Sequence, residues 1–498
     1  MRAVATMSEV PYQRRLERAV VRFQARLEGG VGDRWIPNVV AVALAAWLIQ
    51  VGLDRLEGFE TGVDLAGYSQ AIWLMTQGLE PRASLFGVGV HILELRWSFI
   101  LYPLSIPARL FDPAEVLVVS QALALGVAVI PLWRLAREVA KLRVGAAAAL
   151  VVAFALHPAT HRLTVDDFHP VVLAVPAIIG MAYFGKTKRW VWYWACVVFA
   201  LLTRADLGLA IALWGFVLLG DGERRGGIWT LGVGSIWSLA LLLVAQPLLG
   251  DGVVSGSAAG YNGQSLGDLV LDSFRTPIDS LQIILAQDNL ELIVALLAPV
   301  IFLPLLSLRY ILPSLPLGAL YLLVGSADDV AFAERAAMLL AFVMIAATFA
   351  LNRLGNTGVD RVFLDVRLLT TLTAASVLLF VATSVTSPYA QPWTWDERDP
   401  TDQAIARATA LLDAETPTRA SPSALATLSE RPWLFPLPTD SAPTAVRQNF
   451  PAFTRAVLVV DREIQERTPE ERMEFDANMG LQGFVLEFDD SGVALYVR

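Results

Sequence analysis

The stretch IPNVVAVALAAWLIQVGL, residues 36–53, decides the fold, because it carries no charged side chain and can cross the hydrocarbon core of a bilayer as one helix. Apolar blocks of about 15–22 residues recur from there to about Thr386. Hydrophobic residues make up 55% of the 498-residue chain, charged residues only 17%, and the mean hydropathy is +0.54. These values exclude a water-soluble core and predict a membrane protein.

Hydropathy predicts about eleven spans in an α-helical polytopic domain over residues 36–386. The predicted spans are residues 36–53, 113–133, 144–156, 171–184, 190–203, 207–219, 228–249, 292–307, 310–325, 336–351 and 368–385. A further apolar run, residues 98–111, is interrupted by Pro103 and Pro107. We expect this run to form a helix that dips into the outer leaflet.

The loops between these spans differ in charge, and short cytoplasmic loops are the ones that accumulate Lys and Arg. With the N-terminus in the cytoplasm, the basic segments all fall inside: residues 134–143, 186–189, 220–227 and 352–367, and the link at Arg309. The outer side then receives residues 54–112, 157–170, 204–206, 250–291, 326–335 and everything after Thr386, with all four histidines. We therefore predict a multi-pass protein of the inner (plasma) membrane with a large first outer loop, residues 54–112.

The leader, residues 1–35, is long, polar and rich in arginine before any apolar run begins, so it does not resemble a cleaved signal peptide. Spaced apolar residues among the arginines favour an amphipathic helix on anionic lipid. A flexible basic leader is the alternative.

The composition shifts at Ser387 toward Pro, Thr, Asp and Glu, which predicts a soluble domain over residues 387–498 on the extracytoplasmic side. Its expected elements are a helix around residues 402–414, a strand at 456–461, a helix around 469–479 and a hairpin at 483–497. This pattern indicates a small α/β or α+β unit. It contains no catalytic motif, so a substrate-shaping or packing role is expected.

Composition also excludes several classes of function. A net charge of −9 with scattered basic residues argues against nucleic acid as a partner. The single cysteine, Cys196, allows neither a disulfide nor a cysteine metal site within one chain. Phosphate-binding glycine loops, serine hydrolase elbows and zinc-protease helices are absent from the sequence.

The first candidate residues lie in the first outer loop, where Asp64, Tyr68 and Gln70 follow the first span and His91 comes later. A carboxylate just outside a span could act as a general base between a lipid-borne donor and a water-borne acceptor. A solvated side chain or a helix cap is the alternative for such an aspartate.

The second group lies in residues 157–170, with His157, His161, Asp166, Asp167 and His169. Two carboxylates and three imidazoles are unusual in so short a connector. Such ligands suit a divalent cation, although the spacing matches no compact zinc signature. A hydrogen-bonded polar loop is the alternative.

The third group is Arg204 with Asp206, a charge pair inside otherwise apolar sequence. Charges near membrane depth are costly unless they pair or line a cavity. The pair therefore indicates either a site or an ion pair that only fixes a turn. Asp328, Asp329, Glu334 and Arg335 form a similar group that we expect to be more exposed.

Taken in order, these motifs resemble an uncharacterised prokaryotic membrane family, the domain-of-unknown-function family 2079. The resemblance rests on the run Asp64-Leu65-Ala66-Gly67-Tyr68-Ser69-Gln70-Ala71-Ile72-Trp73, the later His91, the loop Asp167-Phe168-His169-Pro170 and the turn Arg204-Ala205-Asp206. Leu425 to Pro436 and the strand ending at Asp461 are also similar, so the resemblance covers nearly the whole chain.

That family resembles the GT-C superfamily of polytopic glycosyltransferases, which use polyprenyl-phosphate sugars and keep an essential acidic residue in the first outer loop. The resemblance implies that Asp64 has this role. In this chain Ser69 stands where a second acidic residue is usual, and Ala205 stands where Glu is expected. These departures leave one base candidate in the loop, and a non-catalytic relative is the alternative.

The resemblance implies transfer of a sugar from a polyprenyl-phosphate donor to an unknown acceptor at the outer face, with inversion. Arg204, with Arg335, would stabilise the departing lipid phosphate. The residues expected to position the sugar, the acceptor or a divalent cation are Tyr68, Gln70, His91, Asp166, Asp167, His169 and Asp206. A membrane transporter and a non-catalytic scaffold that presents the C-terminal domain are the rival interpretations.

Overall fold

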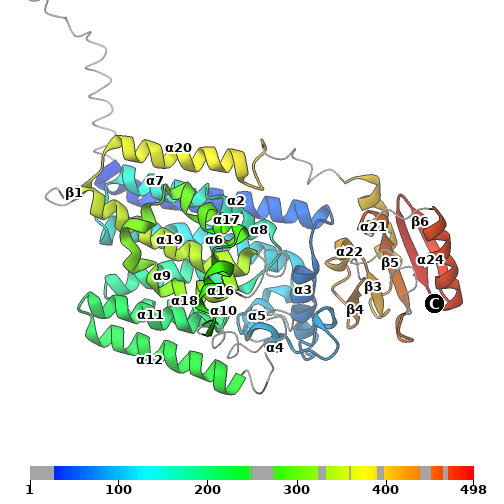
Figure 1. Ribbon diagram of the computed structural model, residues 1–498. Coiled ribbons are helices and arrows are strands. Elements are labelled where there is room, and N and C mark those ends of the chain that lie inside the picture. Colours follow the sequence, from blue (N-terminus) through cyan, green and yellow to red (C-terminus); the bar gives the residue numbers. More distant parts are fainter. Residues whose placement is uncertain are drawn as a thin grey trace, which may run out of the picture.

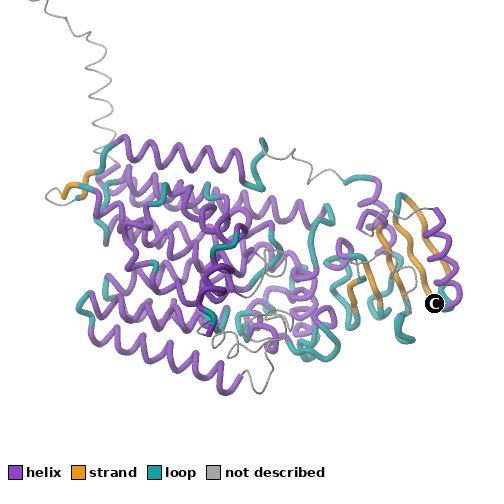
Figure 2. The backbone as a smooth tube through the Cα atoms, viewed as in Figure 1, coloured by secondary structure: helices purple, strands orange, loops and turns teal. Residues whose placement is uncertain are grey.

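The computed structural model describes residues 27–245, 275–323, 332–357, 361–389, 398–437, 450–463 and 469–498, together with Leu248 and Ser273. Its helices pack side by side in a bundle, and a small sheet lies beyond one end of it (Figure 1). A two-stranded ribbon, β1 (Asn356–Thr357) and β2 (Val362–Phe363), marks the opposite end (Figure 2). The leader falls mostly outside the described residues.

Six helical stretches in the described part of the chain are long and apolar enough to cross a membrane. They are α2 (Gly32–Glu57), α6 (Pro113–Arg134) with η4 (Leu135–Val139), α7 (Val144–Ala155) with α8 (Pro158–Val165), α12 (Arg224–Ala240) with η6 (Leu241–Ala245), α19 (Phe332–Leu354) and α20 (Val366–Thr383). Each overlaps a predicted span, but α7 with α8 continues to Val165, past the predicted end at residue 156 and into the segment that we expected to be an outer loop. These helices confirm a multi-pass membrane protein.

Shorter apolar helices occupy three more predicted spans. The last two groups are pairs of helices, each pair bent sharply at a short break. The shorter ones are η5 (Pro170–Leu173) with α9 (Ala174–Lys186), α10 (Trp190–Thr203) and α11 (Leu207–Gly220). The bent pairs are α16 (Pro277–Ile284) with α17 (Gln287–Leu297) and η7 (Ala298–Val300), at 55°, and η8 (Leu303–Tyr310) with η9 (Leu312–Ser314) and α18 (Leu315–Leu323), at 74°. The number of eleven spans stays a prediction.

The predicted continuous span over residues 292–307 is wrong. Ile301 and Phe302 both adopt left-handed backbone conformations, with φ of 45° and 56°, and they end the helical run that begins at Gln287. Pro304 comes two residues after Phe302, and proline cannot donate the backbone hydrogen bond that would continue the helix. Hydropathy alone does not detect this break, because the residues on both sides of it are apolar.

A buried ion pair ties α2 to η4, the turn that continues α6, at the β1–β2 end of the bundle. Arg137 donates from Nε to Asp33 Oδ1 at 2.6 Å and from Nη2 to Asp33 Oδ2 at 3.0 Å. The Trp133 indole donates to the same carboxylate at 3.0 Å. A buried guanidinium needs such a bidentate partner, so this contact fixes the register of the two helices.

The sheet at the other end has the strand order β4-β3-β5-β7-β6 and is mixed. Its strands are β3 (Thr418–Ala420), β4 (Leu434–Pro436), β5 (Ala456–Val460), β6 (Val485–Asp490) and β7 (Val493–Val497). The helices around it are α21 (Pro400–Ala410), α22 (Pro422–Leu425) and α24 (Pro469–Leu481). The expected helices, central strand and hairpin are present, whereas the domain boundary at Ser387 stays a prediction.

The sheet is attached to the first outer loop through α3 (Val63–Thr76) and η2 (Ser84–Phe86). The Ser84 hydroxyl accepts from the Leu434 backbone N–H at 2.9 Å and donates to the Leu434 carbonyl at 2.7 Å, as a neighbouring strand would. Gln70 donates to Ser84 Oγ and to the Arg431 carbonyl, each at 3.0 Å. Apolar side chains of the loop and of the sheet form one continuous core.

Replacing Gln70 by Leu should weaken this attachment. Leucine has about the size of glutamine, but it leaves the Arg431 carbonyl and the Leu85 N–H without their amide partner. Such unpaired groups lower the free energy of unfolding by about 1–3 kcal/mol. We expect a lower thermal unfolding midpoint and faster proteolysis between the membrane helices and the sheet. Gln77→Leu, at an exposed position at the end of the same helix, is the control and should change neither.

Candidate functional site

Asp64 lies in the first turn of α3, directly after Gly62 and Val63, and its side chain is 43% exposed. The rest of this helix is largely buried, from Leu65 through Ile72. The positive end of the helix dipole favours a charged carboxylate at this position. Asp64 is therefore an accessible carboxylate on a rigid, buried helix.

The loop after α8 brings Asp167 and His169 to Asp64. His169 is 2% exposed, and its Nε2 atom lies 3.8 Å from Asp64 Oδ2. The Asp167 carboxylate accepts from the Gly62 backbone N–H at 2.9 Å. A Cβ at Gly62 would lie only 2.5 Å from Asp167 Oδ2, so this close approach requires glycine. The structure thus unites two of the three sequence motifs.

One side chain that sequence reasoning missed holds this loop in place. Gln121, buried in α6, donates to the Leu163 and Asp167 carbonyls at 2.8 Å each and accepts from the His169 N–H at 3.0 Å. The sequence does indicate this role, because Gln121 is a lone amide inside the apolar residues 113–133, and polar groups at membrane depth need partners.

Asp167 has an altered proton affinity. Burial raises the pKa of Asp167, and the nearby Asp64 carboxylate raises it further, whereas the Gly62 N–H, Arg55 and His169 act in the opposite direction. The two carboxylates therefore differ in environment: Asp64 faces solvent and Asp167 is enclosed.

Tyr68 and Gln70 serve packing. The Tyr68 ring is buried and makes edge contacts with Phe86 at 5.3 Å and with Phe168 at 5.5 Å between ring centroids. Gln70 is directed at the sheet, as described above. These contacts position α3, and a substrate-binding role for Tyr68 and Gln70 stays a prediction.

Arg204 and Asp206 form a separate buried cluster with Tyr321, at the turn between α10 and α11. Arg204 Nε donates to Asp206 Oδ2 at 2.9 Å, and the Tyr321 hydroxyl donates to the same oxygen at 2.5 Å. The guanidinium also lies over the Tyr321 ring, 4.6 Å from its centroid. These contacts fix the turn against α18, and Tyr321 is a second residue that sequence reasoning missed.

Arg335 is buried, which corrects the expectation of an exposed group. It lies in the first turn of α19 and is 3% exposed, and its charged neighbours include Arg162, Asp166 and Asp288. Among the described residues, none accepts a hydrogen bond from its Nε or Nη1 atoms. A buried guanidinium with such spare donors suits an anionic ligand. Asp328, Asp329 and the Glu334 side chain lie outside the described residues.

The other histidines lie away from Asp64. His157 donates from Nε2 to the Leu296 carbonyl and accepts at Nδ1 from Ala159, each at 3.1 Å. His161 donates from Nε2 to the Ala155 carbonyl and accepts at Nδ1 from Thr386, each at 2.7 Å. Both rings use both nitrogens structurally, so neither can bind a metal in this state.

His91 caps α4 (Ile92–Arg96) by accepting from the Leu93 N–H at 3.1 Å. Burial lowers the pKa of His91, and the nearby Arg82 lowers it further. Its surroundings are the charged side chains of the same loop, Arg82, Glu80 and Glu94. His91 therefore belongs to a loop-stabilising group.

A divalent cation was one possible ligand of the polar groups in residues 157–170. Across the described ranges, no group of three or more His, Cys, Asp and Glu side chains is arranged to hold a metal ion. Asp64, Asp167 and His169 are instead arranged around hydrogen bonds and one carboxylate–imidazole contact. General acid–base chemistry is what this geometry can perform.

Comparison with known proteins gives one family and a fold. The sequence matches the model of a family described as "Predicted membrane protein (DUF2079)" over residues 55–495. The fold is similar to a crystal structure of ArnT from Cupriavidus metallidurans in the apo state, with a TM-score of 0.52, 14% identity and coverage of 92% of this chain and 96% of that chain. A second crystal structure of that protein, bound to undecaprenyl phosphate, has a TM-score of 0.52, 12% identity and coverage of 92% and 97%. No curated protein matches.

The altered pKa of Asp167 predicts a pH-dependent stability. Because the folded protein holds this proton more tightly than the unfolded chain, the free energy of unfolding falls as pH rises above the ordinary aspartate value of 3.8. Asp167→Asn removes this titration and keeps an oxygen that can accept from Gly62. The stability of the variant relative to the wild type should therefore be higher at about pH 7 than at about pH 4. If the unfolding midpoints of the variant and the wild type in detergent differ by the same amount at both pH values, the raised pKa of Asp167 is not the cause.

Proposed function

The chain belongs to the domain-of-unknown-function family 2079 of predicted membrane proteins, and on that premise we propose that it is a GT-C-type membrane glycosyltransferase. It transfers a sugar from a polyprenyl-phosphate donor to an acceptor hydroxyl at the outer face of the membrane. The observation that carries the proposal is the meeting of an accessible Asp64 with buried His169 and Asp167 at one end of the bundle.

The similarity to ArnT, a GT-C glycosyltransferase, supports the reaction class. One of the similar structures is bound to undecaprenyl phosphate, which supports a polyprenyl phosphate as the lipid carrier.

In the proposed reaction Asp64 is the general base. Its carboxylate takes the proton of the acceptor hydroxyl, and the acceptor oxygen forms a bond to the anomeric carbon of the donor sugar. The bond between that carbon and the phosphate oxygen breaks on the opposite face, and the polyprenyl phosphate leaves with the electron pair. The configuration at the anomeric carbon is inverted. His169, 3.8 Å away, orients the carboxylate, and the enclosed Asp167 holds the loop on Gly62.

Arg335 is the proposed ligand of the departing phosphate. Its Nε and Nη1 donors have no acceptor among the described residues, and a phosphate oxygen would supply one. Arg204 directs its Nε donor to Asp206, so we assign the Arg204–Asp206 pair to positioning the sugar. Asp166 is a charged neighbour of Arg335 and also of Arg55, which interacts with Asp167 as well.

The decisive variant is Asp64→Asn. It removes the base while preserving shape, so transfer from a polyprenyl-phosphate sugar should become undetectable in proteoliposomes, with an unchanged unfolding midpoint. Glu115→Gln, at an exposed carboxylate in the first turn of α6, is the matched control and should retain activity.

Unchanged turnover by the Asp64 variant would remove Asp64 from the mechanism. Solute uptake into the same proteoliposomes without consumption of sugar-lipid would favour the transporter instead. The scaffold would be favoured by two results together. A triple variant at Asp64, His169 and Arg204 would keep its cellular function, and deletion of residues 387–498 would abolish that function.

A second variant tests the phosphate ligand. Arg335→Gln should raise the KM for the polyprenyl-phosphate sugar about tenfold and lower kcat as well, because the guanidinium binds a group whose charge grows as the bond breaks. Arg109→Gln removes an exposed arginine of the first outer loop and should change neither constant. Equal kinetics for the Arg335 variant and the wild type would exclude this assignment.

A further inference from the structure

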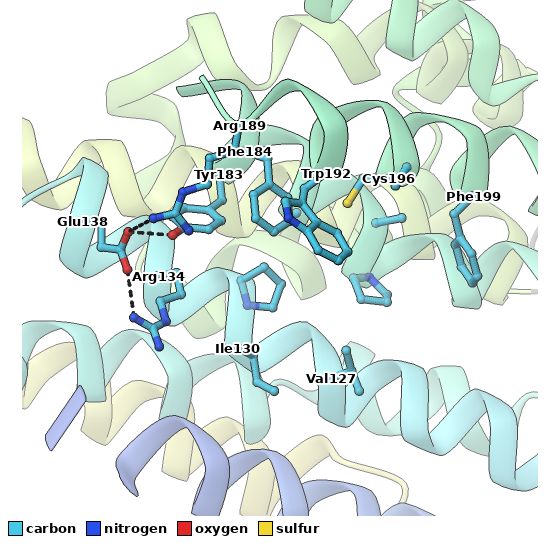
Figure 3. Close-up of a pocket in the computed structure, with 15 residues that line it drawn as sticks. Val127, Ile130, Arg134, Glu138, Tyr183, Phe184, Arg189, Trp192, Cys196 and Phe199 are labelled. Atoms are coloured by element: carbon cyan, nitrogen blue, oxygen red, sulfur yellow. Dashed lines mark hydrogen bonds and ion pairs between the residues drawn. The ribbon is translucent and has the colours of Figure 1, made fainter. Parts of the chain in front are cut away.

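A cavity of about 630 Å³ opens on the side of the bundle between α6, α9 and α10. Val127, Ile130 and Pro131 of α6 form one wall, and Trp192, Cys196 and Phe199 of α10 form the other (Figure 3). Ala177 and Gly180 of α9 form its floor, where small side chains leave the space open. We call this cavity the lateral slot.

One end of the lateral slot is polar. Glu138 accepts from Arg134 at 2.9 Å and from the Tyr183 hydroxyl at 2.6 Å, and it lies 3.7 Å from Arg189 (Figure 3). The Arg134 and Arg189 side chains are 46% and 54% exposed. Two guanidiniums with five donors each face one carboxylate, so this end keeps a net positive charge and donors for a further anion.

The rest of the lateral slot is apolar and faces outward. Val127 lies on a helix that is long and apolar enough to cross a membrane, and Trp192 and Phe199 lie on a shorter apolar helix; all three side chains are exposed. From Arg189 to Phe199 the rise along α10 is about 15 Å, which is half of a hydrocarbon core of about 30 Å. The slot thus has the depth of one leaflet, and the Trp192 ring, stacked on Phe184 at 6.2 Å, forms its wall near the polar end.

This place is far from the proposed transfer site. Pro113 begins α6 next to the core of the first outer loop, and Arg134 ends it about 30 Å further along the axis. The charged mouth therefore lies at the end of the bundle that the charge pattern predicts to be cytoplasmic. A lipid seated here cannot present its headgroup to Asp64.

We propose that the lateral slot binds one anionic phospholipid of the leaflet at that end. Its phosphate lies between Arg134 and Arg189, and one acyl chain runs along Ile130 and Val127 toward Phe199. Charge complementarity selects an anionic headgroup, and the apolar depth selects a lipid over a free phosphate ion. The site is separate from the proposed transfer reaction and does not depend on it.

The single cysteine of the chain gives a direct probe, because Cys196 lines the lateral slot. In the full-length protein in detergent micelles, phosphatidylglycerol should slow alkylation of Cys196 by N-ethylmaleimide about tenfold. Phosphatidylcholine and inorganic phosphate should leave the rate unchanged. Native mass spectrometry of the same samples should count one retained phosphatidylglycerol.

The matched variants separate the lateral slot from general surface charge. Arg134→Gln with Arg189→Gln should abolish both the protection and the retained lipid. Arg224→Gln with Arg225→Gln removes the same charge from exposed positions at the start of α12, outside the slot, and should preserve both. Three results would each overturn the proposal. Phosphatidylcholine could protect Cys196 as well as phosphatidylglycerol does, inorganic phosphate alone could protect it, or the Arg134 and Arg189 variant could retain the lipid.

Discussion

The amide of Gln121 is the contact on which the proposed site depends. Its two N–H groups and its oxygen all bond to the segment from Leu163 to His169, so α6 fixes the backbone that carries Asp167 and His169. With that backbone fixed, Asp167 can meet Gly62 and His169 can approach Asp64. A buried amide with every donor and acceptor used rigidifies its surroundings, whereas a partly satisfied one would destabilise them.

The sequence predicted most helices well, because charged residues end the apolar runs at the bundle ends. The predicted run 190–203, for instance, coincides with α10. Other features depend on contacts across the chain. β3 and β4 are three residues each, which is too short to show the alternation of apolar and polar residues by which a strand is predicted. The burial of Arg335 and the role of Gln70 could not be predicted either, since both follow from neighbours far away in the sequence.

The two residues that depart from the family pattern, Ser69 and Ala205, are both buried in this structure. Ser69 is fully buried and shares a hydrogen bond of 2.8 Å with Ser429. A carboxylate in that place would lose its hydration with only hydroxyl partners, which is costly. Ala205 is equally buried, between Arg204 and Asp206. The small residues at these positions thus fit the packing, and Asp64 stays the accessible carboxylate of α3.

The attachment of the sheet to α3 has a consequence for biosynthesis. Ser69 and Ser429 are 360 residues apart in the chain, so α3 is synthesised long before its partner exists. At the usual rate of translation this interval is roughly 20–70 s. During that time the polar face of α3 has to be shielded by water, lipid headgroups or a chaperone. Completion of the core between α3 and the sheet is accordingly among the last steps in the maturation of this protein.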